Sequence, residues 1–397
     1  MSEKRMIYFD NAATTKVYPE VVEAMLPYYT ELYGNPSSVY SFSQRVKNDE
    51  TAARDLIADT IGAKSNEIYF TAGGTESDNW ALKASAEFYR DKGKHIITST
   101  IEHHAILHSC EYLEKQGFEI TYLPVDEEGR VNPEELKKAI RPDTILISIM
   151  FANNEIGTIQ PIAEIGKIAR EHGILFHTDA VQAYAHIPID VNAMNIDMLS
   201  ASGHKFGGPK GIGFLYIRSG VKIRSFIHGG SQERKRRAGT DNIPGIIGMA
   251  KAAQISVSNM QKFAEHEQKL RDYLIERLGN EFEHVKINGS LSERLPNNVN
   301  VCFRFIEGEG MLILLDNAGI CASSGSACTS GSLDPSHVLL AIGLPHEKAH
   351  GSLRISLSPE NTKEEIDILV EELKKIIARL RSMSPLYEDY LKKHPKN

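Results

Sequence analysis

Four consecutive residues, Ser202-Gly203-His204-Lys205, are the most promising group for chemistry in this chain of 397 residues. They follow the apolar segment 197–201, so Lys205 stands just after a predicted strand. Its amine can form a Schiff base with an aldehyde, while the Ser202 hydroxyl and the His204 imidazole can hold a phosphate. The run therefore predicts a site for a phosphorylated aldehyde cofactor.

Asp179 and Gln182 lie one predicted strand earlier. A buried carboxylate can keep a pyridine nitrogen protonated, and an amide can bind a ring oxygen. Because ligands of open α/β sheets bind at the carboxyl ends of strands, Asp179 and Lys205 can face one crevice. Together they predict a site for pyridoxal phosphate (PLP). The alternatives are that Asp179 caps the next segment and that Gln182 lies on the surface.

The run Gly73-Gly74-Thr75-Glu76-Ser77 follows a predicted strand and opens a predicted helix. Glycines let a phosphate approach the backbone, and the N-terminus of a helix offers free N–H groups. A simple capped turn, with Thr75 as the N-cap, explains the run about as well on its own. The presence of Lys205 in the same chain favours the phosphate interpretation.

Three further polar positions are candidates for the site, and the first is predicted to lie at the same edge of the sheet. His103 follows a strand that ends near residue 100 and can stack on a flat ring or move a proton, unless it is a solvent-exposed residue at a helix start. One of Asn153 and Asn154 can bind a carboxylate or a ring oxygen, although turn chemistry explains these residues equally well. Arg354 can clamp a carboxylate, or face solvent from its strand.

Cys328 differs from the other three cysteines because it lies among small residues, in the run Ser323–Ser332. Such a segment buries little apolar surface, so we expect a mobile loop with a reactive thiol. Cys302 and Cys321 lie in apolar runs, and Cys110 lies in a helical pattern, as expected of structural cysteines. The chain has no Cys-x-x-Cys pair, and neighbouring His103 and His104 cannot face one point, so we expect no metal site.

The elements that position these residues alternate through the first two thirds of the chain. This alternation predicts a mostly parallel sheet with helices on both faces. The expected strands are 68–71, 95–100, 119–125, 144–152, 174–180, 198–202 and 211–218, and the expected helices are 75–89, 103–117, 133–140 and 162–172.

The last third of the chain predicts a smaller α+β domain with an antiparallel sheet. A helix over 263–278 is expected to end at Gly279. Apolar residues alternate over 299–305 and over 353–357, as in half-exposed strands. Thr362 and Glu365 form a capping box before a long amphipathic helix.

The composition limits the classes of partner and of cellular location that fit this chain. A net charge of −7 argues against nucleic acid as a partner, and we expect the short basic run 234–237 to be a solvated loop. The apolar stretches are too short to cross a bilayer, the N-terminus does not resemble a secretory signal, and the four cysteines suit a reducing compartment. These features predict a soluble, cytoplasmic protein.

The motifs together resemble the NifS- and IscS-like cysteine desulfurases, PLP-dependent members of the class V aminotransferases with PLP fold type I. The resemblance covers essentially the whole chain. It rests on Tyr8–Thr15, Gly34–Ser38, Gly73–Ser77, Glu102-His103, Asn153–Gly157, Ser202–Lys205, Ser323–Ser330 and Arg354. It implies a large domain over 15–258 with a seven-stranded sheet, a small domain of 1–14 and 259–397, and a mobile cysteine loop at about 324–334.

The resemblance also implies roles at the cofactor. Lys205 would bind the PLP aldehyde and move protons, and His103 would stack on the ring as acid or base. Asp179 would pair with the ring nitrogen and Gln182 with the ring hydroxyl. The phosphate would bind Gly74, Thr75, Ser202 and His204, with Thr240 supplied by the second subunit of a homodimer.

At the substrate, Asn154 and Arg354 would hold the carboxylate of L-cysteine, with Asn35 also in contact. Cys328 would take the sulfur, leaving alanine and a persulfide for an iron–sulfur scaffold or a sulfur carrier. Departures from the family pattern leave the acceptor open; they are Tyr40, Ser43, Ser231 and Lys235. The alternatives are a related PLP β-lyase, a selenocysteine lyase or an aminotransferase.

Overall fold

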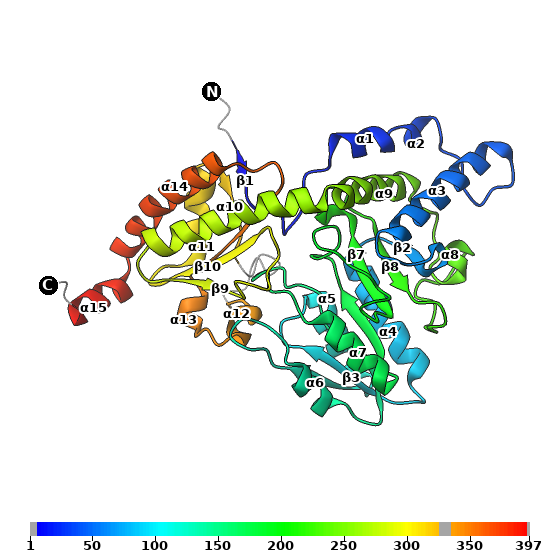
Figure 1. Ribbon diagram of the computed structural model, residues 1–397, viewed down its shortest axis with the longest axis horizontal. Coiled ribbons are helices and arrows are strands. Elements are labelled where there is room, and N and C mark those ends of the chain that lie inside the picture. The colour runs from blue at the N-terminus through cyan, green and yellow to red at the C-terminus, as the bar shows by residue number, and fades with distance from the viewer. Residues whose placement is uncertain (1–5, 325–334, 395–397) are drawn as a thin grey trace.

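A seven-stranded sheet forms the centre of the larger part of the molecule, as the computed structural model shows for residues 6–324 and 335–394 (Figure 1). The strands lie in the order β2-β8-β7-β6-β5-β3-β4, and β8 alone among them runs antiparallel to its neighbours. Their bounds are β2 (Ile68–Thr71), β3 (His95–Ser99), β4 (Glu119–Leu123), β5 (Thr144–Ser148), β6 (Leu175–Asp179), β7 (Met198–Ser202) and β8 (Gly213–Ile217). The predicted mostly parallel sheet is confirmed.

Helices cover both faces of this sheet because successive strand residues point to opposite sides. Ile147 and Phe214 pack with α3, α7 and α9, whereas their neighbours Leu146 and Leu215 pack with α4 and α5. The helices of this part are α1 (Pro19–Met25), α2 (Pro27–Thr30), α3 (Ser41–Asp59), α4 (Gly74–Tyr89), α5 (His104–Lys115), α6 (Pro133–Ala139), α7 (Ile162–His172), α8 (Gln232–Lys235) and α9 (Ile243–Ser258).

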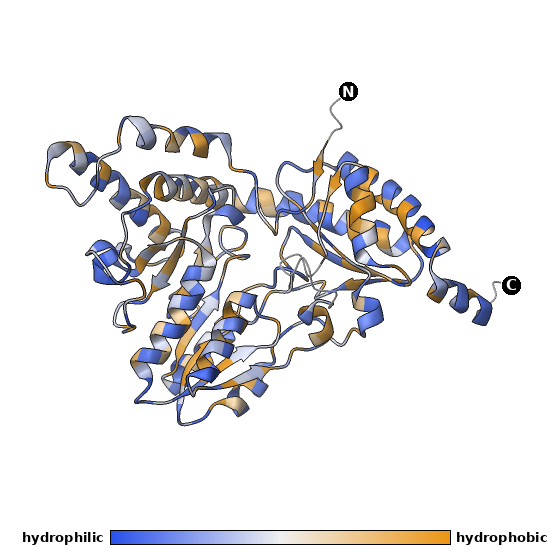
Figure 2. Ribbon diagram, turned by 180° about the vertical axis from the view of Figure 1, so that it is seen from behind, coloured by the Kyte–Doolittle hydropathy of each residue, from blue (hydrophilic) through white to orange (hydrophobic). Residues whose placement is uncertain are grey.

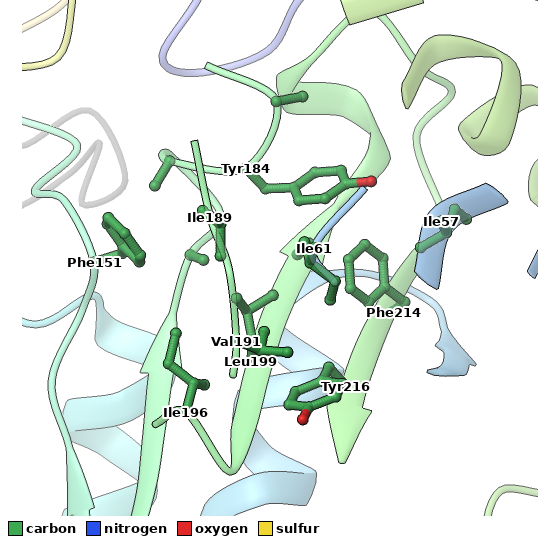
Figure 3. Packing of buried hydrophobic residues seen from close by; sticks show 14 of the residues in the cluster. Ile57, Ile61, Phe151, Tyr184, Ile189, Val191, Ile196, Leu199, Phe214 and Tyr216 are labelled. Atoms are coloured by element: carbon green, nitrogen blue, oxygen red, sulfur yellow. The ribbon is translucent and has the colours of Figure 1, made fainter. Parts of the chain in front are cut away.

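The core continues directly behind the lysine that the sequence singles out. Tyr184, from the segment after β6, packs edge-to-face against Phe214, with ring centroids 5.1 Å apart (Figure 3). It packs in the same way against Phe206, with ring centroids 5.0 Å apart. Because Phe206 follows Lys205 in the chain and is buried, the backbone at Lys205 rests on a rigid aromatic cluster.

A second, three-stranded antiparallel sheet has the order β12-β10-β9. Its core packs against α10, which crosses toward the larger sheet, and against α11 and α14 (Figure 1). The apolar stripe of α14 faces inward and its charged residues face outward (Figure 2). The bounds are β9 (Val285–Asn288), β10 (Asn298–Phe303), β12 (Ser352–Ser356), α10 (Met260–Glu281), α11 (Gly308–Asn317) and α14 (Lys363–Ser382).

The N-terminal strand joins this second part, where β1 (Ile7–Tyr8) pairs in parallel with β11 (Ile320–Cys321). Short helices complete it, namely α12 (His337–Ala341), α13 (His346–Ala349) and α15 (Pro385–Lys393). The predicted small antiparallel sheet is confirmed. The domain division at 14/15 and 258/259 stays a prediction.

Local expectations are met in some places and wrong in others. The capping box is present, with Thr362 Oγ1 accepting from the Glu365 N–H at 3.3 Å. Gly279 does not end its helix, since α10 continues to Glu281. β10 is buried at every position instead of half-exposed, because it is the central strand and Asn300 donates to the carbonyl oxygen of Glu155.

In the described part of the chain, none of the helices combines the length and the apolar character that a membrane crossing requires.

Candidate active site

The N-terminus of α4 forms one end of the site. Gly73, not Thr75, is the N-cap, with a φ of 151° that favours glycine. A Cβ on Gly74 would lie 2.5 Å from Val181 Cγ2, so a side chain there would crowd the approach to the helix. A cavity of about 680 Å³ opens at this point. Its lining includes Thr14, Gly73, Gly74, Thr75, Ser202 and His204.

Lys205 stands at the end of the short 3₁₀ turn Gly203–Lys205, which follows β7. Its Nζ donates to the carbonyl oxygens of Ala12 and Ala13, at 2.6 and 2.9 Å. Gln182 Nε2 donates to the same Ala12 oxygen at 2.9 Å, so Gln182 lies beside Lys205 and not on the open surface. The sequence did not reveal these carbonyls, because any residue type can supply a backbone oxygen.

The N-terminal segment also contacts the phosphate end. His204 Nδ1 lies 3.2 Å from Thr14 Oγ1, and burial, followed by the charge of Lys205, lowers the pKa of His204 to about 4. The ring is therefore neutral near pH 7 and can donate one hydrogen bond. Arg237 forms an ion pair with Glu76 at 2.8 Å beside the same cavity, so the expectation of a solvated basic loop is wrong at that residue.

Asp179 ends β6 and is 6 % exposed. Its Oδ1 accepts from the Val181 N–H at 2.9 Å, as in a capped turn. Burial raises the pKa of Asp179 to about 6, and the nearby charge of Lys205 opposes that rise. Asp179 thus both caps a turn and presents a buried carboxylate near Lys205.

A buried polar network adjoins Asp179. His177 Nε2 lies 2.9 Å from Ser200 Oγ and 3.7 Å from the carboxylate of Asp78. Burial and the charge of Asp179 raise the pKa of Asp78 well above its ordinary value. Two adjacent buried carboxylates do not both ionise easily. The Val181 N–H and the charge of Lys205 both stabilise the ionised form of Asp179. The negative charge therefore belongs on Asp179.

His103 is the N-cap of α5, and its Nδ1 accepts from the Ala105 N–H at 3.1 Å. This contact assigns the proton of the neutral ring to Nε2. Burial, followed by the charge of Lys205, lowers the pKa of His103 to about 4. His103 is therefore a neutral residue near Lys205 and not a solvent-exposed one.

Arg354 lies on β12 and is 3 % exposed, so the solvent-facing alternative is wrong. Its guanidinium donates to Asp10 at 2.9 Å and to the carbonyl oxygen of Asn154 at 3.3 Å. Its Nε is buried and has no hydrogen-bond partner among the described residues. An unused buried donor beside Asn154 suits a ligand carboxylate.

Cys328 lies outside the described residues, which end at Ser324 and resume at Pro335. The flanking residues are held at the site. Ser323 exchanges backbone hydrogen bonds with Arg354, at 2.6 and 3.2 Å, and Ser336 Oγ donates to the carboxylate of Glu155. His337 Nε2 contacts the carbonyl oxygen of Glu102 at 3.0 Å. Both attachments thus lie beside Arg354, Asn154 and His103.

Two predicted residues are not brought to this group by any contact in the described part of the chain. Asn35 is exposed and accepts from the Ser37 N–H at 2.9 Å, and Thr240 is exposed. Of the other cysteines, Cys110 and Cys302 are buried, as expected, and burial raises the pKa of Cys302 to about 11.

The residues present fit PLP. The phosphate cavity has backbone N–H groups, a hydroxyl and a neutral imidazole. A Cβ on Gly74 would crowd Val181, so a phosphate can approach this backbone closely only because residue 74 is glycine. Asp179 offers a buried carboxylate that a protonated ring nitrogen would stabilise. Lys205 follows His204 in the chain and its charge acts on Asp179, so the amine that would bind the aldehyde adjoins both groups.

Comparison with known proteins agrees with this chemistry. The family model for aminotransferase class V matches residues 7–369. The chain belongs to this family. Its members depend on PLP, so the predicted cofactor is confirmed.

Similar proteins narrow the family. A protein named cysteine desulfurase IscS from Methanosarcina thermophila is 60% identical over 385 residues, which are 97% of this chain and 95% of the relative. A solved NifS-like protein is 42% identical with a TM-score of 0.89, covering 95% of this chain and all of the other. SspA, solved in complex with cysteine, is 40% identical with a TM-score of 0.79 and covers 90% of this chain and all of the other.

These relatives confirm the predicted family, fold and cysteine desulfurase class. The roles of individual residues stay predictions.

Proposed function

We propose that this protein removes sulfur from L-cysteine, leaving L-alanine, and that Cys328 receives the sulfur as a persulfide. One observation supports this most: the residue that begins the Cys328 segment, Ser323, pairs with the buried Arg354. Cys328 lies four positions after Ser324, a chain length of at most about 14 Å, so the thiol can reach a ligand bound at Arg354. The similarity to SspA, solved with cysteine, supports the choice of substrate.

Bound PLP would supply an electron sink for cleavage of the substrate at its β carbon. Lys205 would hold its aldehyde carbon, Asp179 its ring nitrogen and Gln182 its ring hydroxyl. Its phosphate would be held by Gly74, Thr75, Ser202 and His204, with Thr240 supplied by a second copy of the chain.

The protein side chains have separate tasks in this proposal. Lys205 Nζ would move a proton at the substrate α carbon, because the Ala12 and Ala13 carbonyls position this amine at the site. His103 donates from Nε2–H, since Nδ1 is occupied by the Ala105 N–H. Asp78 keeps its proton so that the charge stays on Asp179.

Arg354 and Asn154 would hold the substrate carboxylate, and Asn35 would complete the contact. The Arg354 Nε is the donor that a carboxylate oxygen would fill. Fixing the carboxylate sets the orientation of the thiol side chain relative to Cys328.

The sulfur step is a displacement at sulfur. The Cys328 thiolate attacks the substrate sulfur, a sulfur–sulfur bond forms and the carbon–sulfur bond breaks. The electron pair of the broken bond stays with the substrate carbon, which takes up a proton to give the methyl group of alanine. No external oxidant or reductant is needed.

We further propose that the protein works as a cytoplasmic homodimer, in which Thr240 completes the phosphate site, and that an iron–sulfur scaffold or a sulfur carrier accepts the persulfide. The exposed positions of Tyr40, Ser231 and Lys235 make these departures from the family pattern relevant to the choice of acceptor.

The experiment compares the protein with Cys328→Ser in L-cysteine and a reductant. The variant should keep the colour of bound PLP and lose production of alanine and sulfide. Undiminished sulfide release by the variant would contradict the role of Cys328. Formation of pyruvate or glutamate in place of alanine would favour a β-lyase or an aminotransferase.

A further inference from the structure

A second cavity, of about 560 Å³, lies between the N-terminal segment, the start of α10 and the loop after β12. It shares Thr14 with the phosphate cavity. Lys205 lines it, but within the described residues neither Asp179 nor His103 does. Its size falls in the range of ordinary small-molecule sites. Apart from Lys205 and Thr14, the described residues that line this cavity differ from those predicted to contact PLP.

One face of α10 forms a wall of this cavity. Met260, Phe263, Ala264 and Glu267 line it, and their spacing of three and four residues places them on a single helical stripe. Three of these four side chains are apolar. Glu267 is only 2 % exposed, although it is an acid on an otherwise apolar stripe.

The carboxylate of Glu267 has no counter-ion in the part of the chain that the structure describes. Within the described residues, no hydrogen bond or ion pair reaches it. Arg271, one turn later on the same helix, donates instead to the Leu295 carbonyl oxygen at 3.0 Å and to its neighbour Asp272. Unpaired buried acids are rare and unfavourable. Burial raises the pKa of Glu267 to about 8, so the group is near its point of ionisation at physiological pH.

Aromatic rings complete the surroundings of Glu267. Tyr18 and Phe263 line the cavity. Burial raises the pKa of Tyr18, the hydrogen bond between Tyr18 and Ser256 opposes that rise, and the negative charge of Glu267 adds to it. The Tyr18 ring occupies space that only glycine leaves open, since a Cβ on Gly207 would lie 2.1 Å from it. Aromatic faces and a carboxylate both attract cations.

We propose that this cavity binds an organic cation with an apolar body, with the Glu267 carboxylate as its counter-ion and Tyr18 and Phe263 as aromatic walls. The proposal is independent of the desulfurase function. It follows from the cavity, the unpaired buried carboxylate and the rings around it.

The other charged groups of the cavity do not already neutralise Glu267. Lys16 pairs with Glu360 at 3.1 Å, and Glu365 caps α14. Lys205 Nζ donates to two backbone carbonyls. His186 contacts the Lys205 carbonyl oxygen at 3.0 Å and, with its pKa lowered by burial, is neutral near pH 7. The lining is therefore able to accept one more positive charge.

Binding of a cation should be linked to pH with a definite sign. A cation stabilises the ionised form of Glu267 and lowers its pKa from about 8. Below that pH, binding must expel a proton, so affinity rises with pH by up to about tenfold per unit and levels off above it. A site without a titrating carboxylate would show no such slope.

The test uses the full chain with PLP bound and the probe benzyltrimethylammonium. This quaternary cation has no N–H group and cannot react with the PLP aldehyde. Isothermal titration calorimetry at about pH 6.5 and about pH 8.5, in two buffers of different ionisation enthalpy, gives affinity and proton release. We expect tighter binding at the higher pH, proton release at the lower pH, and much weaker binding of neutral benzyl alcohol.

Two matched variants test whether Glu267 is responsible for probe binding and for its pH dependence. Glu267→Gln keeps the shape and removes the charge, whereas Glu276→Gln removes an equal charge from the exposed side of the same helix. Glu267→Gln should lower the affinity at least about tenfold and abolish its pH dependence, and Glu276→Gln should change neither. Absence of probe binding at the higher pH, or an unchanged pH slope in Glu267→Gln, would overturn the proposal. If Glu267→Gln does not fold, proton release by the unmodified protein decides the question.

Discussion

Replacing Arg354 by lysine tests the proposed carboxylate clamp. The substitution keeps the positive charge but removes the planar fork and the Nε donor. In the structure that Nε is buried and has no partner among the described residues, while the rest of the guanidinium binds Asp10 and the Asn154 carbonyl oxygen. A substrate carboxylate would satisfy the unused donor.

The size of the effect follows from that donor. Leaving a buried donor unsatisfied costs about 1–3 kcal/mol, which substrate binding would recover. Arg354→Lys forfeits this gain, so the KM for L-cysteine should rise by about 5- to 150-fold. The kcat should change much less, because Lys205 and the bound cofactor are unchanged in this variant.

The assay measures alanine production over a range of L-cysteine concentrations, together with PLP absorbance. Arg294→Lys is the matched control. Arg294 is also buried, but its guanidinium donates to the backbone carbonyls of Ser290, Asn288 and Asn298. This control should lose stability and keep its KM. A KM for Arg354→Lys within about twofold of the original would refute the clamp.

Three further predictions concern the same site. His103→Gln should lower kcat by about 10²-fold or more with PLP retained, and the native pH profile should show no step at the ordinary histidine pKa, because His103 has a pKa of about 4. Burial raises the pKa of Glu155 from 4.5 to about 7, so the contribution of Glu155 to the free energy of unfolding falls by about 3 kcal/mol as pH rises from 4.5 to 7. Denaturation at both pH values should show that Glu155→Gln lacks this loss, and parallel profiles would be the contrary result. Gly74→Ala should weaken PLP binding at least about fivefold, measured by equilibrium dialysis, because its Cβ would crowd Val181, and unchanged binding would argue against the phosphate site.

Much of the fold and site could be predicted from local patterns. Strand β7 has the bounds expected from its apolar run, and helix α7 ends where Gly173 adopts its left-handed conformation. Because the site lies at strand ends, correct strand boundaries were enough to group Asp179 with Lys205. Short-range periodicity carries this information directly.

Other features depend on contacts between distant parts of the chain and have no local signal. The Ala12 carbonyl oxygen accepts hydrogen bonds from both Lys205 and Gln182. Every residue has a backbone carbonyl, so the sequence cannot predict which one takes this role. The Asp10–Arg354 ion pair joins residues at opposite ends of the sequence. The burial of β10 was missed because its polar residues face Asn154 and Glu155 from the larger part of the molecule.

The unpaired acid of the second cavity was missed for the same reason. Glu267 lies in a polar-rich helix, where an exposed surface position is the ordinary expectation. It is buried where α10 lies against the N-terminal segment and the loop after β12.

The most direct test is the mass of the peptide that contains Cys328 after incubation of the protein with L-cysteine in the absence of reductant. We expect this peptide to gain the mass of one sulfur atom, to lose it on reduction, and to gain nothing when Lys205 is replaced by alanine. Stoichiometric alanine formation with an unmodified Cys328 peptide would contradict the proposed sulfur transfer.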